Sequence, residues 1–303
     1  MMHFKLVDAF TDKPLGGNPC AVLLGAENLT DEEMLAIARE MNQSETAFLM
    51  RSQSHHLKAR YFTPEREIPL AGHPTIASIH AAIEHGLIKP QESISLELIE
   101  GPIRIDIELK NGVHLIHMFQ RKPKFLERHD PLKIADLFNL KTSDFLDGAP
   151  IQTVCTGTPM MMVPLKSRSA LADIKMNVDE YKKYREKSDF FSPHFFILSG
   201  ATTDGDTFAR HLGMPPDTFE DAFTGSATGC MGAFLWKYGL LTKNKFVAEQ
   251  GHEMGRPGKA VVEAIGDFSD LESVVVAGTA VTVVDGTIRI SKRGNSNGMG
   301  SDF

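Results

Sequence analysis

The sequence predicts an α+β protein of two pseudo-symmetric domains, each a barrel-like, mostly antiparallel sheet wrapped around a central helix. The first observation is a duplication. Ala71–Thr75 and Thr224–Thr228 are each followed by an apolar stretch that ends in Gly-Leu, 14 residues after the shared glycine. The second is that both stretches are apolar around most of a helix's circumference, so both helices must be buried. The third is that strands are the only abundant element left to surround them.

Composition limits the possible functions. The chain has 303 residues, 42% hydrophobic and 23% charged, which suits a globular protein of two domains. A formal charge of -7 without a basic run argues against nucleic acid or an anionic membrane as a partner. Three scattered cysteines, Cys20, Cys155 and Cys230, indicate a reducing compartment rather than a disulfide framework. Without a signal peptide or a membrane-length apolar run, we expect a cytoplasmic protein.

The first half opens with strands at Phe4–Ala9 and Ala21–Leu24, separated by a Gly-Gly-Asn-Pro turn. Thr30 and Glu33 form a capping box that predicts a helix start. Alternating residues predict half-buried strands over Ser44–Met50 and over residues 57–61. The duplicated helix over Pro74–His85 comes next, and a meander follows whose Asn-Gly pair predicts a hairpin. Its strands cover Ile94–Ile99, Ile103–Leu109 and Val113–Phe119.

The second half repeats this plan. Residues 1–127 and 128–292 are the expected halves, with the charged, proline-containing segment Glu127–Ala149 as the crossover and 293–303 as a flexible tail. This division leaves open that a late strand of the second half crosses back to pair in the first half. After the helix that starts at Gly225, strands are expected at Phe246–Glu249, Val261–Ile265, Val274–Val284 and Thr287–Ile290, with Asp285-Gly286 as a hairpin turn.

The paired helix starts predict an anion site between the halves. A helix N-terminus presents unpaired backbone N–H groups and a partial positive charge. Gly72, Gly225 and Ser226 would therefore offer N–H groups and one hydroxyl to a carboxylate. Glycine chosen for close packing explains either position singly, but explains the pair poorly.

Seven blocks in order along the chain resemble the PhzF (phenazine biosynthesis) family. They are Asp8–Thr11, Gly17–Pro19, Asn42–Thr46, Tyr61–Pro64, Ala71–Pro74, Asp221–Ala227, and Glu249–Gly251 with Gly255–Pro257. The resemblance implies the diaminopimelate epimerase fold, an isomerase activity and a homodimer. The family commonly has proline after the aspartate of the sixth block, where this chain has Ala222, which loosens the backbone at that point.

Racemases and epimerases of this wider fold carry a cysteine just before each paired glycine. This chain has Ala71 and Thr224 there, so a mechanism with two thiols is chemically impossible. We interpret Cys230, like Cys20 and Cys155, as a packing residue.

Glu45 is the candidate proton carrier. In a half-buried strand, desolvation would raise the pKa of its carboxyl group, which suits a group that takes and returns a proton. A solvated glutamate at a strand edge is the alternative. The resemblance implies that the glutamate of this Ser-Glu-Thr block is catalytic, taking a hydrogen from one ring carbon and returning it to another.

The remaining candidates lie at the helix starts. The resemblance implies that His73 contacts substrate, where a helix-capping histidine is the alternative. It also implies that Asp221 binds or polarises the substrate, where compensation of a helix dipole is the alternative. Ser44, Gly72, Gly225 and Ser226 are the expected substrate-binding residues. His114 and His117 point to opposite faces of a strand, which argues against a shared metal, and we expect neither a metal nor an organic cofactor.

The sequence thus predicts a cofactor-independent isomerase that moves a proton on a small carboxylate, cyclic or unsaturated, with Glu45, His73 and Asp221 as catalytic residues. Two alternatives remain open. One is a racemase or epimerase that uses Glu45 with Asp221 or His73 in place of thiols. The other is a non-catalytic protein of the same fold that binds a metabolite.

Overall fold

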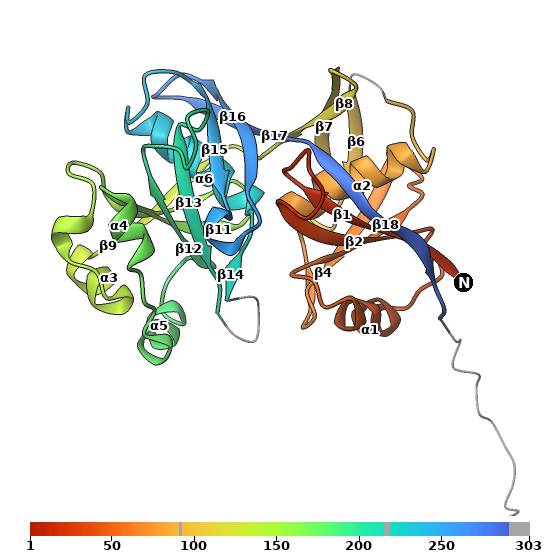
Figure 1. Ribbon diagram of the computed structural model, residues 1–303, viewed down its shortest axis with the longest axis horizontal. Coiled ribbons are helices and arrows are strands. Elements are labelled where there is room, and N and C mark those ends of the chain that lie inside the picture. Colours follow the sequence, from red (N-terminus) through yellow and green to blue (C-terminus); the bar gives the residue numbers. More distant parts are fainter. Residues whose placement is uncertain (91–92, 215–218, 291–303) are drawn as a thin grey trace, which may run out of the picture.

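The computed structural model describes residues 1–90, 93–214 and 219–290, and in Figure 1 the chain folds into two lobes that lie side by side. The predicted tail lies outside the described residues. The first lobe contains β1 (Met2–Ala9), β2 (Asn18–Leu24), α1 (Asp31–Met41), β3 (Thr46–Met50), β4 (Leu57–Phe62), β5 (Glu67–Ile68), α2 (Gly72–Glu84), β6 (Ser93–Glu97), β7 (Ile103–Lys110) and β8 (Val113–Phe119).

The second lobe begins at β9, and the last strand returns to the first lobe. In order, the elements are β9 (Lys124–His129), α3 (Pro131–Phe138), η1 (Thr142–Asp144), β10 (Ile151–Cys155), β11 (Pro159–Pro164), α4 (Arg168–Ala172), α5 (Val178–Arg185), β12 (Ser192–Ile197), β13 (Thr207–Leu212), β14 (Glu220–Asp221), α6 (Gly225–Lys237), β15 (Lys245–Gln250), η2 (His252–Met254), β16 (Gly258–Gly266), β17 (Leu271–Gly278) and β18 (Ala280–Ile288). Within the described ranges, no helix combines the length and apolarity needed to cross a bilayer.

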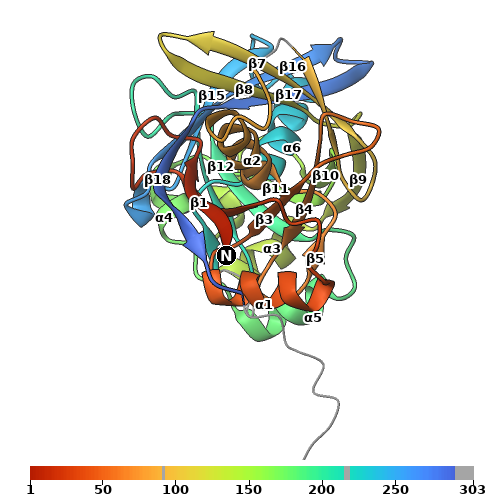
Figure 2. The same ribbon diagram turned by 90° about the vertical axis from the view of Figure 1, so that its right-hand side faces the viewer.

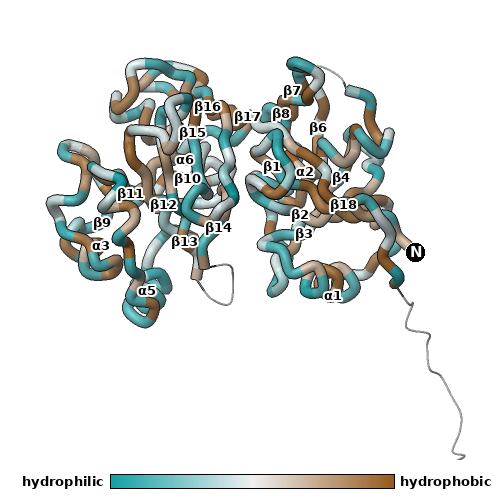
Figure 3. Tube along the Cα trace, viewed as in Figure 1, coloured by the Kyte–Doolittle hydropathy of each residue, from teal (hydrophilic) through white to brown (hydrophobic). Residues whose placement is uncertain are grey.

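Each lobe wraps strands around one buried helix, as the sequence predicts. Figure 2 shows α2 and α6 enclosed by strands of their lobes, and both helices have 13 residues. The chain is buried from Gly72 to Ile79 in α2 and from Gly225 to Leu235 in α6. Figure 3 shows α2 mostly in the brown of apolar residues and the exterior helix α5 largely in teal. Each isoleucine or leucine removed from water in this way contributes roughly 1.5–3 kcal/mol to folding.

The strand at Glu45 differs from its prediction. β3 begins at Thr46, after Glu45, and its first four residues are all buried instead of alternating. The reason is that both faces of β3 are covered. Phe48 packs in the cluster under α1, whereas Ala47 and Leu49 pack in the cluster around α2. The capping box of α1 is confirmed, since the Thr30 and Glu33 side chains each accept a hydrogen bond from the other's backbone N–H.

The connection between the lobes also differs. Glu127–Ala149 is not a crossover, because β9 pairs with β10 and α3 packs in the second lobe's outer core. The chain changes lobe between Phe119 and Lys124. The predicted Asp285-Gly286 turn is wrong, because both residues lie inside β18 and pair with β1 of the first lobe. The predicted strand Val274–Val284 is divided at Thr279, where the chain leaves one lobe for the other.

The strands of the two lobes form one continuous sheet. β17 of the second lobe pairs with β8 of the first, and β18, which follows β17 directly, pairs with β1 of the first lobe. The passage between β17 and β18 runs over Phe10, since a Cβ on Gly278 would lie 2.4 Å from that ring. Phe10 in turn stacks on Phe223 of the second lobe, with ring centroids 4.3 Å apart. These contacts hold the two lobes against each other at the level of the helix starts.

Candidate active site

The starts of α2 and α6 touch. A Cβ built on Gly72 would lie 2.7 Å from the Ser226 backbone nitrogen and 2.8 Å from the Gly225 Cα. Two helices can approach this closely only where neither carries a side chain. A Cβ on Gly225 would lie 2.8 Å from the Phe10 ring and 3.3 Å from the Gly72 Cα, so close packing does explain both glycines. It also brings the two N-termini to one place.

Neither helix start is capped by the side chain before it. Ala71 has no polar atom, and the Thr224 hydroxyl donates to Asp221 Oδ2 at 2.5 Å instead of accepting from the helix. The first backbone N–H groups of both helices are therefore not satisfied by a capping side chain. This is the arrangement that suits an anionic ligand.

A cleft of about 960 Å³ opens between the lobes at this point, and all seven site residues expected from the sequence line it. They are Ser44, Glu45, Gly72, His73, Asp221, Gly225 and Ser226. None of the described residues that line the cleft is a cysteine. Cys20 and Cys230 are fully buried, and burial raises the pKa of both thiols, that of Cys230 to about 12.

Glu45 and His73 form a pair on the first-lobe side. Glu45 Oε2 lies 3.3 Å from His73 Nε2, and Ser44 Oγ lies 3.5 Å from the same nitrogen. The His73 side chain is 4% exposed and that of Glu45 is 21% exposed. Burial lowers the pKa of His73 to about 4, against the opposing effects of the Asp221 charge and the Pro19 backbone, so the imidazole is neutral at pH 7.

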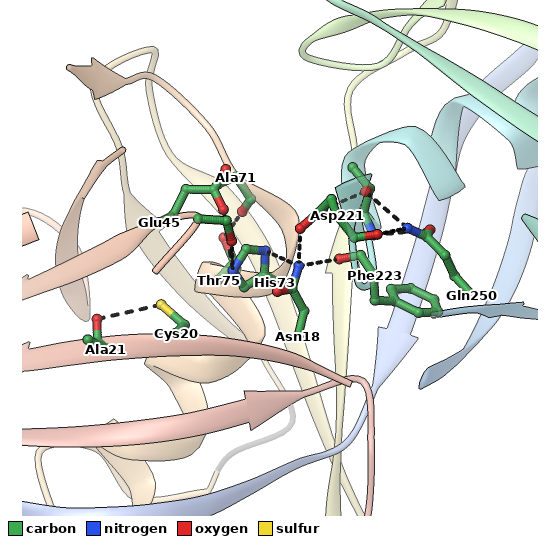
Figure 4. A network of polar contacts seen from close by, with 12 residues as sticks. Asn18, Cys20, Ala21, Glu45, Ala71, His73, Thr75, Asp221, Phe223 and Gln250 are labelled. Atoms are coloured by element: carbon green, nitrogen blue, oxygen red, sulfur yellow. Dashed lines mark hydrogen bonds and ion pairs between the residues drawn. The ribbon is translucent and has the colours of Figure 1, made fainter. Parts of the chain in front are cut away.

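Asn18 connects this pair to the second lobe, as Figure 4 shows. Its amide nitrogen donates to Asp221 Oδ1 at 2.7 Å and to the Phe223 carbonyl at 2.9 Å, and it lies 3.0 Å from His73 Nδ1. Both hydrogens of this amide point to the Asp221 and Phe223 oxygens. On the other side of the ring, Nε2 faces the Glu45 carboxylate, which only accepts when it is ionised, so the ring proton belongs on Nε2.

Asp221 is held from both sides by groups that the sequence did not single out. Besides Asn18 and Thr224, the buried Gln250 side chain donates to the Asp221 carbonyl at 2.7 Å and accepts from the Thr224 N–H at 3.2 Å. Asn18 and Gln250 both lie inside the family blocks quoted above. Membership in those blocks was the only sequence feature that could have marked Asn18 and Gln250 as site residues, because nothing in the residues around them indicates a contact across the lobes.

Comparisons with known proteins agree with this geometry. The profile of the family described as "Phenazine biosynthesis-like protein" (PhzC-PhzF) matches residues 7–286. The uncharacterized isomerase YfhB of Bacillus subtilis is 35% identical over 276 residues, which cover 90% of this chain and 94% of the relative. The trans-2,3-dihydro-3-hydroxyanthranilate isomerase of Pseudomonas chlororaphis is 32% identical over 292 residues, which cover 95% of this chain and 99% of the relative.

A solved structure gives the same result. The crystal structure of a PhzF-family protein from Bacillus anthracis matches with a TM-score of 0.87 at 31% identity, covering 95% of this chain and 99% of that one. The predicted fold is therefore confirmed. The relatives' shared isomerase names disfavour the alternative of a non-catalytic binding protein. The chain belongs to the phenazine biosynthesis-like PhzC-PhzF family, and it is an isomerase.

Proposed function

We propose that this isomerase moves a proton between two carbons of a small, unsaturated, cyclic carboxylate without a cofactor. The observation that carries the proposal is the convergence of Glu45, His73 and Asp221 on one cleft beside the touching helix starts. The Pseudomonas relative is named for isomerising a dihydro-hydroxyanthranilate, an unsaturated cyclic carboxylate. That name supports the substrate class, not the same substrate.

In the proposed reaction, the substrate carboxylate binds at the N-termini of α2 and α6, with the Ser226 hydroxyl as a further donor. The Glu45 carboxylate takes a proton from one carbon and returns it to another, so the double bond moves. The neutral His73 ring donates from Nε2 to the ionised Glu45 or to substrate, which orients the base. Asp221, fixed by Asn18 and Thr224, places negative charge near a substrate amine or enol.

A racemase or epimerase reaction is the second candidate. Two bases on opposite faces of one carbon are what that chemistry needs, and Glu45 and Asp221 do come from different lobes. Against it, Ala71 and Thr224 occupy the positions where the fold's epimerases carry thiols, and the Thr224 hydroxyl is bound to Asp221. The two reactions differ in product, since only the first moves a double bond.

The test is solvent exchange. Trans-2,3-dihydro-3-hydroxyanthranilate and a panel of small unsaturated carboxylates are incubated in heavy water with the parent and with Glu45→Gln, and deuterium at carbon is measured by NMR. Loss of a general base predicts at least about 100-fold slower incorporation in the variant. Glu65→Gln is the matched control, because Glu65 is an exposed residue of the same cleft.

Equal incorporation by the parent and Glu45→Gln would remove Glu45 from the mechanism. Stereoinversion at one carbon without movement of a double bond would select the epimerase reaction instead.

A further inference from the structure

The duplication extends beyond the helices and assigns a counterpart to Glu45. In the first lobe, Arg60 of β4 forms a two-pronged ion pair with Glu67 of β5, with N–O distances of 2.6 Å. In the second lobe, Arg210 of β13 forms the same pair with Glu220 of β14 at 2.8 Å. These equivalent pairs establish that β13 corresponds to β4 and β14 to β5.

The strand that pairs with β4, and the one that pairs with β13, show which residues of the two lobes correspond. β3 runs antiparallel to β4 with Ala47 opposite Tyr61, the residue after Arg60. β12 runs antiparallel to β13 with His194 opposite His211, the residue after Arg210. Glu45 lies two residues before Ala47, and Ser192 lies two residues before His194. Ser192 therefore occupies in the second lobe the position that Glu45 occupies in the first.

Ser192 heads a chain of buried polar contacts that the proposed reaction does not use. Its Oγ lies 2.8 Å from His211 Nε2, and His211 Nδ1 lies 3.3 Å from His194 Nδ1. The three residues are 2%, 4% and 0% exposed in that order. Ser192 and His211 line the active-site cleft, whereas His194 lies behind them.

The hydrogen-bonding protons of Ser192, His211 and His194 can be assigned to particular atoms. Burial lowers the pKa of His211 to about 4 and that of His194 well below its usual value, so both rings are neutral at pH 7. No described residue accepts a hydrogen bond from His194 Nε2, and a buried N–H without an acceptor is less tolerated than a bare lone pair. The His194 proton therefore belongs on Nδ1, from which it donates to His211.

The direction of the remaining hydrogen bonds follows. His211 Nδ1 accepts, so its proton is on Nε2 and donates to Ser192 Oγ. The Ser192 hydroxyl must then direct its own proton elsewhere. Its other contact is the thioether sulfur of Met160 at 3.3 Å, which is a weak acceptor. A substrate oxygen in the cleft would be a better acceptor than this sulfur.

We propose that Ser192, oriented by His211 and His194, is a substrate-contacting hydrogen-bond donor on the second-lobe side of the cleft. The substrate then carries an oxygen acceptor, a hydroxyl or carbonyl group, in addition to the carboxylate bound at the helix starts. The proposal rests on the proposed function, because it names a second polar group of the same substrate. Ser192 determines specificity, and His211 is a positioning residue that acts through it.

The test uses two flat acids that share the carbon skeleton named for the Pseudomonas relative and differ by one hydroxyl, 3-hydroxyanthranilate and anthranilate. Their Kd values are measured by calorimetry on the parent and on Ser192→Ala. A hydrogen bond to a neutral hydroxyl predicts a preference of roughly 5–10-fold for 3-hydroxyanthranilate in the parent. Ser192→Ala should reduce that ratio to about one and leave anthranilate binding nearly unchanged.

Ser188→Ala is the matched control. Ser188 lines the same cleft, but its hydroxyl donates to the Tyr184 carbonyl at 2.8 Å, so its removal should keep the parent ratio. Ser192→Thr restores a hydroxyl and should restore the preference, and His211→Gln should weaken it without abolishing anthranilate binding. Thermal unfolding of each variant establishes that it is folded.

The outcomes separate the two proposals. A parent that prefers 3-hydroxyanthranilate and a Ser192→Ala variant that does not would support the donor role. A preference that persists in Ser192→Ala, or an equal loss for both acids, would overturn this inference and leave the proposed isomerase reaction intact. Failure of the parent to bind either acid would overturn both the cyclic-carboxylate class and the inference that depends on it.

Discussion

Replacement of Gly72 by alanine tests whether the contact between the helix starts positions the catalytic groups. The added Cβ would lie 2.7 Å from the Ser226 nitrogen, 2.8 Å from the Gly225 Cα and 2.9 Å from its carbonyl carbon. All three atoms are backbone, so no side chain can rotate away. Ordinary contact begins near 3.4 Å, and the helix starts must therefore separate by about 0.7 Å.

The expected effects follow from that displacement. Forcing an extra carbon into a packed interface costs about 1–3 kcal/mol, which lowers Tm by roughly 2–6 °C in a protein of this size. Misplacement of reacting groups by close to 1 Å costs up to about 100-fold in rate, because the helix starts that bind the carboxylate and Glu45 no longer meet the substrate in the right relative position. Thermal unfolding measures the first effect, and the rate of deuterium incorporation measures the second.

Gly286→Ala is the control for the substitution itself. Gly286 lies in β18, and a Cβ there would meet nothing nearer than Phe4 Cε1 at 3.5 Å. This variant should keep the parent's Tm and exchange rate. A Gly72→Ala variant that is as stable and as active as Gly286→Ala would refute the reasoning, since the lobes would then have room between the helix starts.

Asn18→Leu removes the N–H donor shared by Asp221 and the Phe223 carbonyl. The variant should have a free energy of unfolding about 1–3 kcal/mol lower than the parent in urea titrations. An unchanged urea midpoint would mean that this bridge between the lobes adds no stability. Because burial lowers the pKa of His73 to about 4, the unfolded chain takes up a proton between about pH 6.5 and pH 4 that the native state does not. Stability should therefore fall as the pH falls through that window. The buried His194 and His211 contribute in the same direction, so His73→Gln should make the slope shallower without removing it, and an identical slope in the variant would contradict this. Iodoacetamide at pH 7.5 should label the partly exposed Cys155 far faster than the two buried thiols, as measured by mass spectrometry, and rapid labelling of Cys20 in the native protein would count against its burial.

Local patterns in the sequence predicted the elements whose signals are local. The capping box at Thr30 specified the start of α1, and the apolar circumference of the duplicated helices specified burial inside strands. The Asp285-Gly286 turn failed for the opposite reason. The pair has hairpin chemistry, but Lys5 Nζ donates to the Asp285 carboxylate at 2.6 Å and the pairing with β1 keeps the segment extended. Tertiary pairing outweighed the local turn preference there.

In the candidate site, too, some residues could be predicted from local sequence patterns and others only from the tertiary structure. The spacing of the paired glycines predicted two helix starts, and the family resemblance supplied Glu45, His73 and Asp221, all of which line one cleft. Asn18 escaped notice because its partners lie 55 to 205 residues away in the chain. Ser192 and His211 escaped for the same reason, since only the strand register reveals that Ser192 matches Glu45.

By itself, the sequence determined the duplicated architecture, the family and the loss of the thiol mechanism, because each depends on residue types at fixed spacing. Tertiary structure alone decided how close the two halves come, which side chains span them and where the protons of the buried histidines lie. The physical reason is that hydrogen bonds and van der Waals contacts act over a few ångströms in space, whereas their partners here come from lobes that are far apart in the chain.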